Sequence, residues 1–249
     1  MLVLLPPSEG KAPGGTMGPL DLDQLSFPAL TQARERLVHV VEHLAATRPD
    51  ALLAALDLSE RQRREVDTDA ALTSSRTLPA MRRYTGVLYE ALDHASLTGG
   101  ALRRANSSLV VASALFGLVR PADRIPAYRL SGATRLPGFG GLAAHWRPVL
   151  EAELVTAGLV VDLRSGPYAA LARVPQSIQV RVLRETDGQR TVVSHDNKYT
   201  KGKLARVLCE QGARTVRDVA EAGRHVADDV EVTGSKVDLV LYGLASQRG

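Results

Sequence analysis

Short apolar runs and amphipathic stripes follow one another along this chain. Runs of the length of a buried strand stand at 2–5, 109–112, 159–163 and 237–242. Two further strands, 178–183 and 191–194, are predicted to pair as a hairpin around Asp187-Gly188. Strands are therefore expected along the whole length of the sequence.

Between the strands, apolar residues recur at helical spacing. A helix is expected to bury each of these sets: Ala33, Leu37, Val40, Val41 and Leu44; Met81, Tyr84, Leu88 and Leu92, after a start near Pro79; Trp146, Val149, Leu150 and Leu154, within 142–157; and Leu204, Val207 and Leu208, before Gly212. Another helix is expected to open at Ser59, with Gln62 completing a capping box. Strands scattered among helices predict one α/β (α+β) domain over residues 1–249, with a mixed sheet flanked by helices.

The composition narrows the class of protein. A chain of 249 residues with 45% hydrophobic and 23% charged residues can bury a full core, which excludes a disordered chain and, with no internal repeat, a repeat array. Its single cysteine, Cys209, excludes an internal disulfide framework and is expected to be buried packing. We expect no signal peptide and no membrane contact, and hence a cytoplasmic protein.

The positive charges are distributed unevenly by type. The net charge is +4, and of 31 basic residues only five are lysines: Lys11, Lys198, Lys201, Lys203 and Lys236. If Thr200 caps the helix that carries Leu204, then Lys201 and Lys203 lie in its first turn, where cations are disfavoured unless an anion binds. Lys198, Lys201, Lys203 and Arg206 are therefore predicted to form a phosphate-sized pocket. The alternative is a chance cluster on a solvated helix face.

A second basic region runs from Arg120 to Arg129, and Pro121 and Pro126 within it stiffen its backbone. Arg120, Arg124 and Arg129 either contact a ligand or are held by acidic neighbours, as Arg120 could be by Asp123. Glu9, just after the first strand, is the candidate catalytic acid or base, although no spacing pairs it with a partner.

Two motif matches fail on inspection. His39 to His43 fits H-x-x-E-H, but both histidines fall on the face opposite the apolar stripe, so no metal site is expected. The pairs Gly10-Lys11 and Gly202-Lys203 do not complete a phosphate-binding loop. No cofactor is predicted.

Five stretches resemble the bacterial YaaA (peroxide stress, UPF0246) family, in family order and over nearly the whole chain. They are Leu-Leu-Pro-Pro-Ser-Glu-Gly-Lys ending at Lys11, Tyr84 to Tyr89, Ser113 to Pro121 continuing to Tyr128-Arg129-Leu130, Val160 to Ser165 with Tyr168, and Lys198 to Arg206. The opening around Glu9 and Lys11 is similar to the actinobacterial branch.

The resemblance implies a cytoplasmic protein of the peroxide-stress response that limits damage from intracellular iron. It also implies a YaaA-like fold with a helix–hairpin–helix-like element and a positively charged cleft for duplex or distorted DNA. The matching residues are Lys11, Arg120, Tyr128, Arg129, Lys198, Lys201 and Arg206.

Two functions follow as hypotheses. The first is a module that binds DNA through phosphates, without reading bases. The second is an enzyme that acts on a nucleotide-like or phosphorylated small molecule. It would use Glu9 and the lysine cluster to break or form a bond at the nucleobase or its sugar. Direct iron sequestration is poorly supported, because no ligand spacing for iron is present. The oligomeric state is left open.

Overall fold

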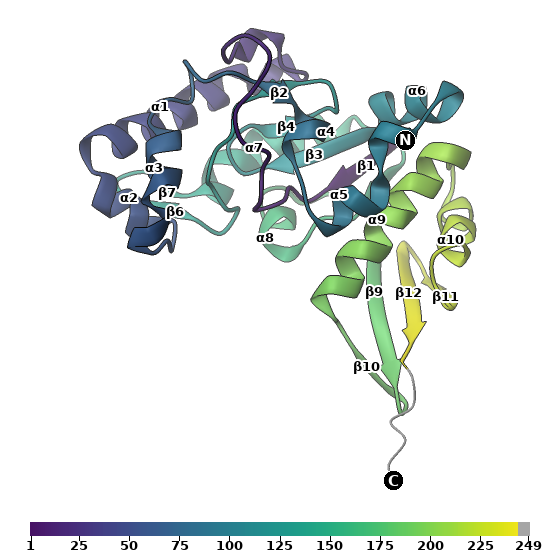
Figure 1. The fold of residues 1–249 in the computed structure, drawn as a ribbon. Coiled ribbons are helices and arrows are strands. Elements are labelled where there is room, and N and C mark those ends of the chain that lie inside the picture. The colour runs from purple at the N-terminus through teal and green to yellow at the C-terminus, as the bar shows by residue number, and fades with distance from the viewer. Residues whose placement is uncertain (244–249) are drawn as a thin grey trace.

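A computed structural model describes residues 1–243, which form a mixed α/β fold around one twisted sheet (Figure 1). The order of the main sheet is β11-β12-β9-β8-β1-β3-β4, with β10 paired to β9. Its strands are β1 (Leu2–Leu5), β3 (Leu109–Ser113), β4 (Gly117–Val119), β8 (Val160–Asp162), β9 (Ile178–Thr186), β10 (Gln189–Thr191), β11 (Asp229–Thr233) and β12 (Lys236–Tyr242). The predicted fold class is confirmed.

The first strand of the chain lies in the middle of this sheet. β1 pairs in parallel with β3 on one side, Val3 opposite Leu109, and with β8 on the other, Leu2 opposite Val160. The parallel set continues through β9 to β12, whereas β4, β10 and β11 are antiparallel. β3 is buried along its whole length, as expected for a parallel strand covered on both faces.

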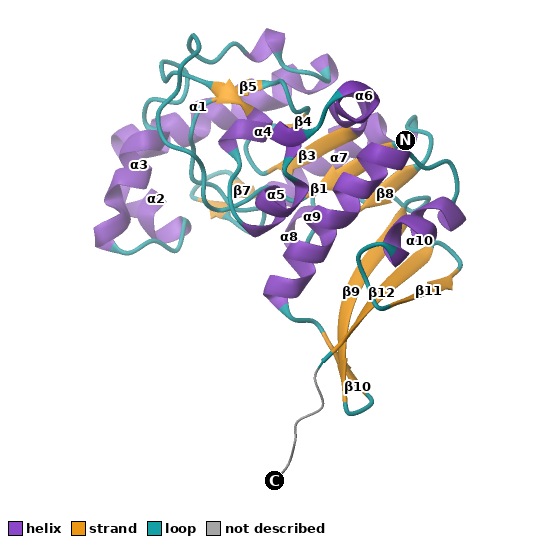
Figure 2. Ribbon diagram, turned by 45° about the vertical axis from the view of Figure 1, so that its right-hand side comes forward, coloured by secondary structure: helices purple, strands orange, loops and turns teal. Residues whose placement is uncertain are grey.

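Ten α-helices pack around the sheet within the described residues (Figure 2). They are α1 (Thr31–Thr47), α2 (Pro49–Ala55), α3 (Arg63–Asp69), α4 (Ala80–Arg83), α5 (Val87–Leu92), α6 (Gly99–Ser108), α7 (Leu142–Val155), α8 (Gly166–Ala169), α9 (Ser194–Gln211) and α10 (Val216–Arg224). α9 packs along α5 and also contacts α6 and β9, while α1, α2 and α3 pack on one another at the far side of the molecule. No helix within residues 1–243 combines the length and apolarity of a membrane span.

Short two-stranded pairings fix the loops between the helices. β2 (Leu78–Pro79) pairs with β5 (Arg124–Ile125), and β6 (Arg135–Leu136) pairs with β7 (Gly140–Gly141). A bridge between Lys11 and Tyr84 ties the loop after β1 to the segment between α4 and α5. The loops that carry the candidate residues are therefore held by backbone hydrogen bonds.

Three predicted elements differ from the structure. The helix expected from Pro79 is two helices, because Tyr84 is extended and Gly86, at φ 93°, turns the chain between α4 and α5. The capping box at Ser59 opens a 3₁₀ turn, Glu60–Gln62, that leads into α3. The second hairpin strand is β10, and Ser194 already begins α9.

Candidate functional site at the carboxyl edge of the sheet

The carboxyl ends of three parallel strands meet at one edge of the sheet. β1 leads to the loop with Glu9 and Lys11, β3 ends at Ser113, and β8 ends at Asp162. β1 connects onward to β3, whereas β8 connects to β9 on the other side, so the chain reverses its winding between β1 and β8. In open α/β sheets, ligands bind at such a reversal point.

Lys11 lies at this edge with its ammonium against aromatic rings. Its Nζ donates to the carbonyl oxygens of Ser8 at 3.1 Å and Glu9 at 3.3 Å. The same nitrogen is 4.1 Å from the centroid of the Tyr128 ring and 5.8 Å from that of Tyr84. Burial, followed by the Arg129 charge, lowers the pKa of Lys11 to about 8.

Three hydroxyl groups form a chain beside Lys11. Tyr128 Oη lies 3.0 Å from Tyr84 Oη and 2.8 Å from Ser113 Oγ. Ser113 Oγ also accepts the backbone N–H groups of Leu115 and Phe116 at 3.2 and 3.0 Å. Burial raises the pKa of Tyr84 to about 12 and that of Tyr128 well above its usual value, so both phenols keep their protons at neutral pH.

Asp69, at the end of α3, is the residue of this site that sequence reasoning missed. Its side chain is fully buried, and Oδ1 accepts the backbone N–H of Arg129 at 2.8 Å. Oδ2 is buried without a hydrogen-bond partner among the described residues. Burial raises the pKa of Asp69 to about 8. The signal was available, because Asp69 lies in helical register with the buried Val66 and Leu72.

Arg129 and Glu9 form the exposed rim of the site. Arg129 Nη2 and Glu9 Oε2 are 3.6 Å apart, and the Glu9 side chain is 78% exposed. A solvated ion pair of this length adds little stability, so the guanidinium can exchange Glu9 for another anion. The structure thus brings together four predicted residues, Glu9, Lys11, Tyr128 and Arg129.

The predicted helix start at Thr200 is wrong. α9 begins at Ser194, because the residues after the hairpin continue directly into helix, and Thr200 is a buried residue inside it. Lys201 and Lys203 therefore do not lie at a helix N-terminus. They point to different sides of α9, since they are two positions apart on a helix.

Lys201 is the buried lysine of α9. Only 7% of it is exposed, and its Nζ lies 3.5 Å from the carbonyl oxygen of Arg164, just beyond β8. Burial lowers the pKa of Lys201 to about 8. The nearby carboxylate of Asp162 is bound by the Arg164 guanidinium at 2.7 Å, so it is not the partner of Lys201.

The other basic residues of α9 face elsewhere. Lys198 is exposed, and Lys203 Nζ lies 5.6 Å from the centroid of the Tyr199 ring. Arg206 pairs with Glu210 at 2.9 Å and donates to the carbonyl oxygens of Leu92 and Asp93, where α5 ends. These contacts cap the carboxyl end of α5, whereas the sequence predicted a contact between Arg206 and a ligand.

Arg120 lies away from Lys11. It follows β4, which runs antiparallel to β3, and its side chain donates to the carbonyl oxygen of Ser107, before β3 begins. The guanidinium covers the Phe27 ring at 5.0 Å. The Asp123 carboxylate accepts the backbone N–H of Arg120 at 2.9 Å, so the suggested pairing uses the Arg120 backbone and not its guanidinium.

Arginines and lysines have different surroundings across the molecule. Within residues 1–243, no lysine nitrogen lies within 4.0 Å of a carboxylate oxygen. Many arginines do, Arg164 and Arg190 among them. Within the described residues, arginine thus supplies the ion pairs of this fold, and no lysine takes part in one.

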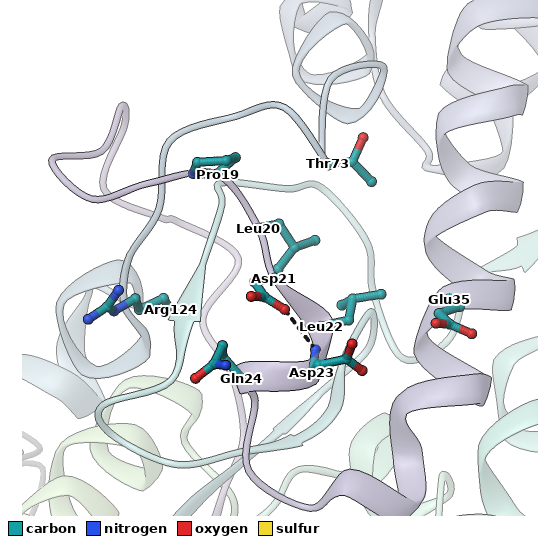
Figure 3. A pocket seen from close by; sticks show the side chains of 9 residues that line it. All are labelled: Pro19, Leu20, Asp21, Leu22, Asp23, Gln24, Glu35, Thr73 and Arg124. Atoms are coloured by element: carbon teal, nitrogen blue, oxygen red, sulfur yellow. Dashed lines mark hydrogen bonds between the residues drawn. The ribbon is translucent and has the colours of Figure 1, made fainter.

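Two clefts mark the surface. One of about 280 Å³ adjoins the Lys201 side of the site and is lined by residues that include Asp162, Arg164 and the exposed Arg173. The larger one, of about 550 Å³, lies between the 19–24 segment and α1 and is lined by Asp21, Asp23, Glu35 and Arg124 among others (Figure 3). Arg124 therefore belongs to this second cleft and not to the cluster around Lys11.

His39 and His43 are exposed on α1, and their rings stack with centroids 6.2 Å apart. This agrees with the predicted wet face of that helix. No group of three or more metal-ligating side chains forms among the residues that the structure describes. Cys209 is buried, as expected for a packing residue.

Comparison with known proteins decides the family. The family model described as peroxide stress protein YaaA matches residues 1–225. The chain belongs to the YaaA family. A UPF0246 protein of Corynebacterium efficiens is 46% identical over 97% of this chain and 99% of its own length. A UPF0246 protein of Streptomyces coelicolor is 46% identical over 93% of this chain and 92% of its own length.

A more distant UPF0246 protein, from Idiomarina loihiensis, is 28% identical over 81% of this chain and 84% of its own length. The YaaA model covers all the elements of the carboxyl-edge site, from β1 to α9. The resemblance seen in the five sequence stretches is therefore confirmed, and with it a family associated with peroxide stress.

Proposed function

We propose that this YaaA-family protein binds DNA, or another phosphate-bearing ligand, at the carboxyl edge of β1 and β8. One observation carries the proposal: the partly buried Lys11 and the buried Lys201 flank the point where the sheet reverses its winding, and among the described residues neither has a carboxylate oxygen within 4.0 Å. The buried Arg164, by contrast, is paired with Asp162.

Electrostatics favour an anion at this place. Removing an ammonium group from water costs free energy unless a countercharge or several hydrogen bonds compensate it. Backbone carbonyls provide part of that compensation for Lys11 and Lys201, and burial still lowers both pKa values to about 8. A phosphate would supply negative charge close to these two lysines.

The surface around the site suits a longer polyanion. Arg129 and Arg173 extend the positive charge of the edge outward, and Lys198 and Lys203 line α9. α9 and α10 are joined by the turn 212–215, and we place the helix–hairpin–helix-like element of the family in this pair. Such contacts would read the DNA backbone and not its sequence. A role in limiting iron damage during peroxide exposure follows only from the family resemblance.

Binding of a fluorescent duplex and of a bubble duplex at 50 and 200 mM NaCl tests this function. About three phosphate contacts would weaken binding about 40-fold between these salt concentrations. Lys11→Met and Lys201→Met remove the charge at similar side-chain length, and each is expected to weaken binding at least about tenfold.

Lys236→Met is the matched control, because Lys236 is exposed at the start of β12 and does not line the cleft beside Asp162. Its affinity is expected to equal that of the unchanged protein. Affinity that does not depend on salt, or equal losses in all three variants, would contradict the proposal. Inorganic phosphate as a competitor shows whether a free phosphate occupies the same site.

The enzyme hypothesis based on Glu9 gains no support from the geometry. The Glu9 carboxylate is mostly exposed and faces Arg129, so the two side chains form an ion pair at the rim of the site. A general acid or base gains its reactivity from an environment that differs from water. Among the acidic residues of this site, Asp69 has such an environment and Glu9 does not.

A further inference from the structure

The cluster around Lys11 contains more hydrogen-bonding capacity than its own members use. Ser113, Tyr128 and Tyr84 carry three hydroxyl hydrogens, but only two contacts join the three groups. Ser113 Oγ accepts two backbone N–H groups, so its hydrogen is donated to Tyr128. One phenol hydrogen, of Tyr84 or Tyr128, is left without an acceptor among the described residues.

Asp69 contributes a second unused group. Oδ1 is fixed by the Arg129 backbone, whereas Oδ2 is fully buried and unpartnered within residues 1–243. A buried carboxyl oxygen without a partner costs about 1–3 kcal/mol, which a ligand or a bound proton donor can recover. Asp69 is also the first of the acidic groups whose charge acts on Lys11.

Lys11 and Asp69 are close enough to influence each other but are not in contact. Their charged atoms do not come within 4.0 Å of each other, yet the Asp69 charge acts on Lys11. As a neutral amine, Lys11 would still donate its two hydrogens to the Ser8 and Glu9 carbonyls and would keep its lone pair free. Both groups titrate near neutral pH, so a free amine and a protonated carboxyl can coexist.

We propose that Lys11 forms an imine with an aldehyde carried by a phosphate-bearing ligand, and that Asp69 transfers the proton in this step. The phosphate contact rests on the function proposed above, and the imine is a separate claim. The ligand class is an aldehyde of a phosphorylated sugar, either the open form of an abasic site in DNA or a small sugar phosphate.

The chemistry balances without a further reactant. The lone pair of the Lys11 amine attacks the aldehyde carbon, and the carbonyl oxygen takes the proton of the Asp69 carboxyl to give a carbinolamine. The Lys11 nitrogen then loses one proton to Asp69, the hydroxyl group takes that proton and leaves as water, and the resulting iminium nitrogen gives its remaining proton back to Asp69. One amine and one aldehyde thus give one imine and one water, and Asp69 ends as it began.

Neighbouring groups fit these steps. The spare phenol hydrogen of the Tyr84–Tyr128 pair can donate to the carbonyl oxygen as its negative charge develops. Arg129 at the rim, held only by the 3.6 Å pair with Glu9, can bind the ligand phosphate. The tyrosine rings exclude water from the side of Lys11 that they cover.

Reductive trapping tests the proposal on the full chain. The protein is incubated with sodium cyanoborohydride and either a duplex containing one abasic site or glyceraldehyde 3-phosphate, and the adduct is located by peptide mass spectrometry. The expected result is one stable adduct on Lys11 with at least one of the two ligands. The two arms show whether the aldehyde comes from DNA or from a small sugar phosphate.

Variants at Lys11 and Asp69 distinguish imine formation from binding of the ligand. Lys11→Arg keeps a positive charge but has no nucleophilic amine, so no adduct is expected even at saturating ligand. Asp69→Asn keeps the size of the side chain and is expected to slow adduct formation at least about tenfold at saturation. Lys236→Arg is expected to leave the yield unchanged.

Two outcomes overturn the inference. One is intact-DNA binding with no adduct on Lys11 from either ligand, which leaves the proposed function standing. The other is an adduct spread evenly over Lys11, Lys198, Lys203 and Lys236, which would show only the general reactivity of amines. An adduct on Lys11 from glyceraldehyde 3-phosphate without any DNA binding would support the imine and contradict DNA as the ligand.

Discussion

Asp69 and Lys11 link the stability of the fold to pH in opposite directions. Burial raises the pKa of Asp69 from 3.8 to about 8, so between these values the folded state holds a proton that the unfolded state has lost. Stability from this group is therefore lost as the pH rises from about 4 to 8. Lys11, lowered from 10.5 to about 8, adds stability as the pH rises above 8.

The Asp69→Asn variant is expected to remove the first of these dependences. The free energy of unfolding of the unchanged protein, relative to the variant, should fall by on the order of 1 kcal/mol per pH unit between pH 5 and 7.5. Urea unfolding at several pH values measures it. Asp67→Asn, an exposed site on the same helix, is the control. If the Asp69→Asn curve runs parallel to that of the unchanged protein, Asp69 is ionised in the fold.

At the residue scale, the sequence led to part of the site. Arg129 was found because it follows a stiff loop, whereas Lys11 and Tyr128 came from the family resemblance. Arg206 was misassigned because a cationic side chain looks the same in sequence whether it caps α5 or binds an anion. Asp69 was missed because helical spacing was applied only to apolar residues, although the same spacing places Asp69 with Val66 on the buried face of α3.

At the element scale, the contact between α9 and α5 depends on a glycine. A Cβ at Gly202 would lie 2.3 Å from the carbonyl oxygen of Leu88 and 2.8 Å from the Cβ of Ala91. Neither atom belongs to a flexible side chain, so the helices would have to separate. Lys201, next to Gly202, keeps its place near Arg164 only if this packing holds.

Gly202→Ala is therefore expected to destabilise the protein by about 1–3 kcal/mol, although alanine is the better helix former by about 1 kcal/mol. Gly100→Ala in α6 is the control, because a Cβ there meets only the ends of arginine side chains. That variant should gain up to about 1 kcal/mol. Thermal or urea unfolding measures both, and a stabilised Gly202→Ala variant would contradict the described packing.

Hydrophobic periodicity predicted most helices and strands, but not all of the residues at which they begin and end. Strands β1, β3, β8, β9 and β12 and helices α1 and α7 lie where apolar patterns placed them. The start of α9 was misplaced because 194–200 carries polar residues that pack against no core and so leave no apolar stripe. The break at Gly86 was missed because the buried side chains of α4 and α5 keep helical spacing across it.

At the scale of the whole molecule, one hydrophobic core joins all parts of the described chain. Buried residues from β1 to β12 form a single cluster, with Val3 and Leu239 among its members. Nothing in this core separates an amino-terminal from a carboxyl-terminal unit. The single domain expected from the sequence is consistent with this cluster.

A single cooperative unfolding transition is therefore expected. Trp146, the only tryptophan, is fully buried and donates its indole N–H to the carbonyl oxygen of Ala114 at 2.8 Å. Its fluorescence reports on the contact between α7 and the end of β3, whereas far-ultraviolet circular dichroism reports on all helices. Coincident urea curves from the two probes would agree with one core. Separate midpoints would show two folding units.

The strand order could not be read from the sequence. Apolar runs show which segments are strands, but the pairing of β1 with both β3 and β8 depends on connections that pass on either side of it. The family resemblance implied the fold, and the pattern alone gave only the class. The site could not be read from the sequence for the same reason, because its residues meet only when the strands pair in this order.

The central place of β1 has a consequence for the order in which the protein can fold. Its neighbours begin at Leu109 and Val160, so β1 has no strand partner until β3 has been synthesised and lacks its second until β8 has been synthesised. Contacts this distant in sequence slow folding. The loop with Lys11 gains its shape only after that closure, so folding intermediates of the amino-terminal part would lack the site.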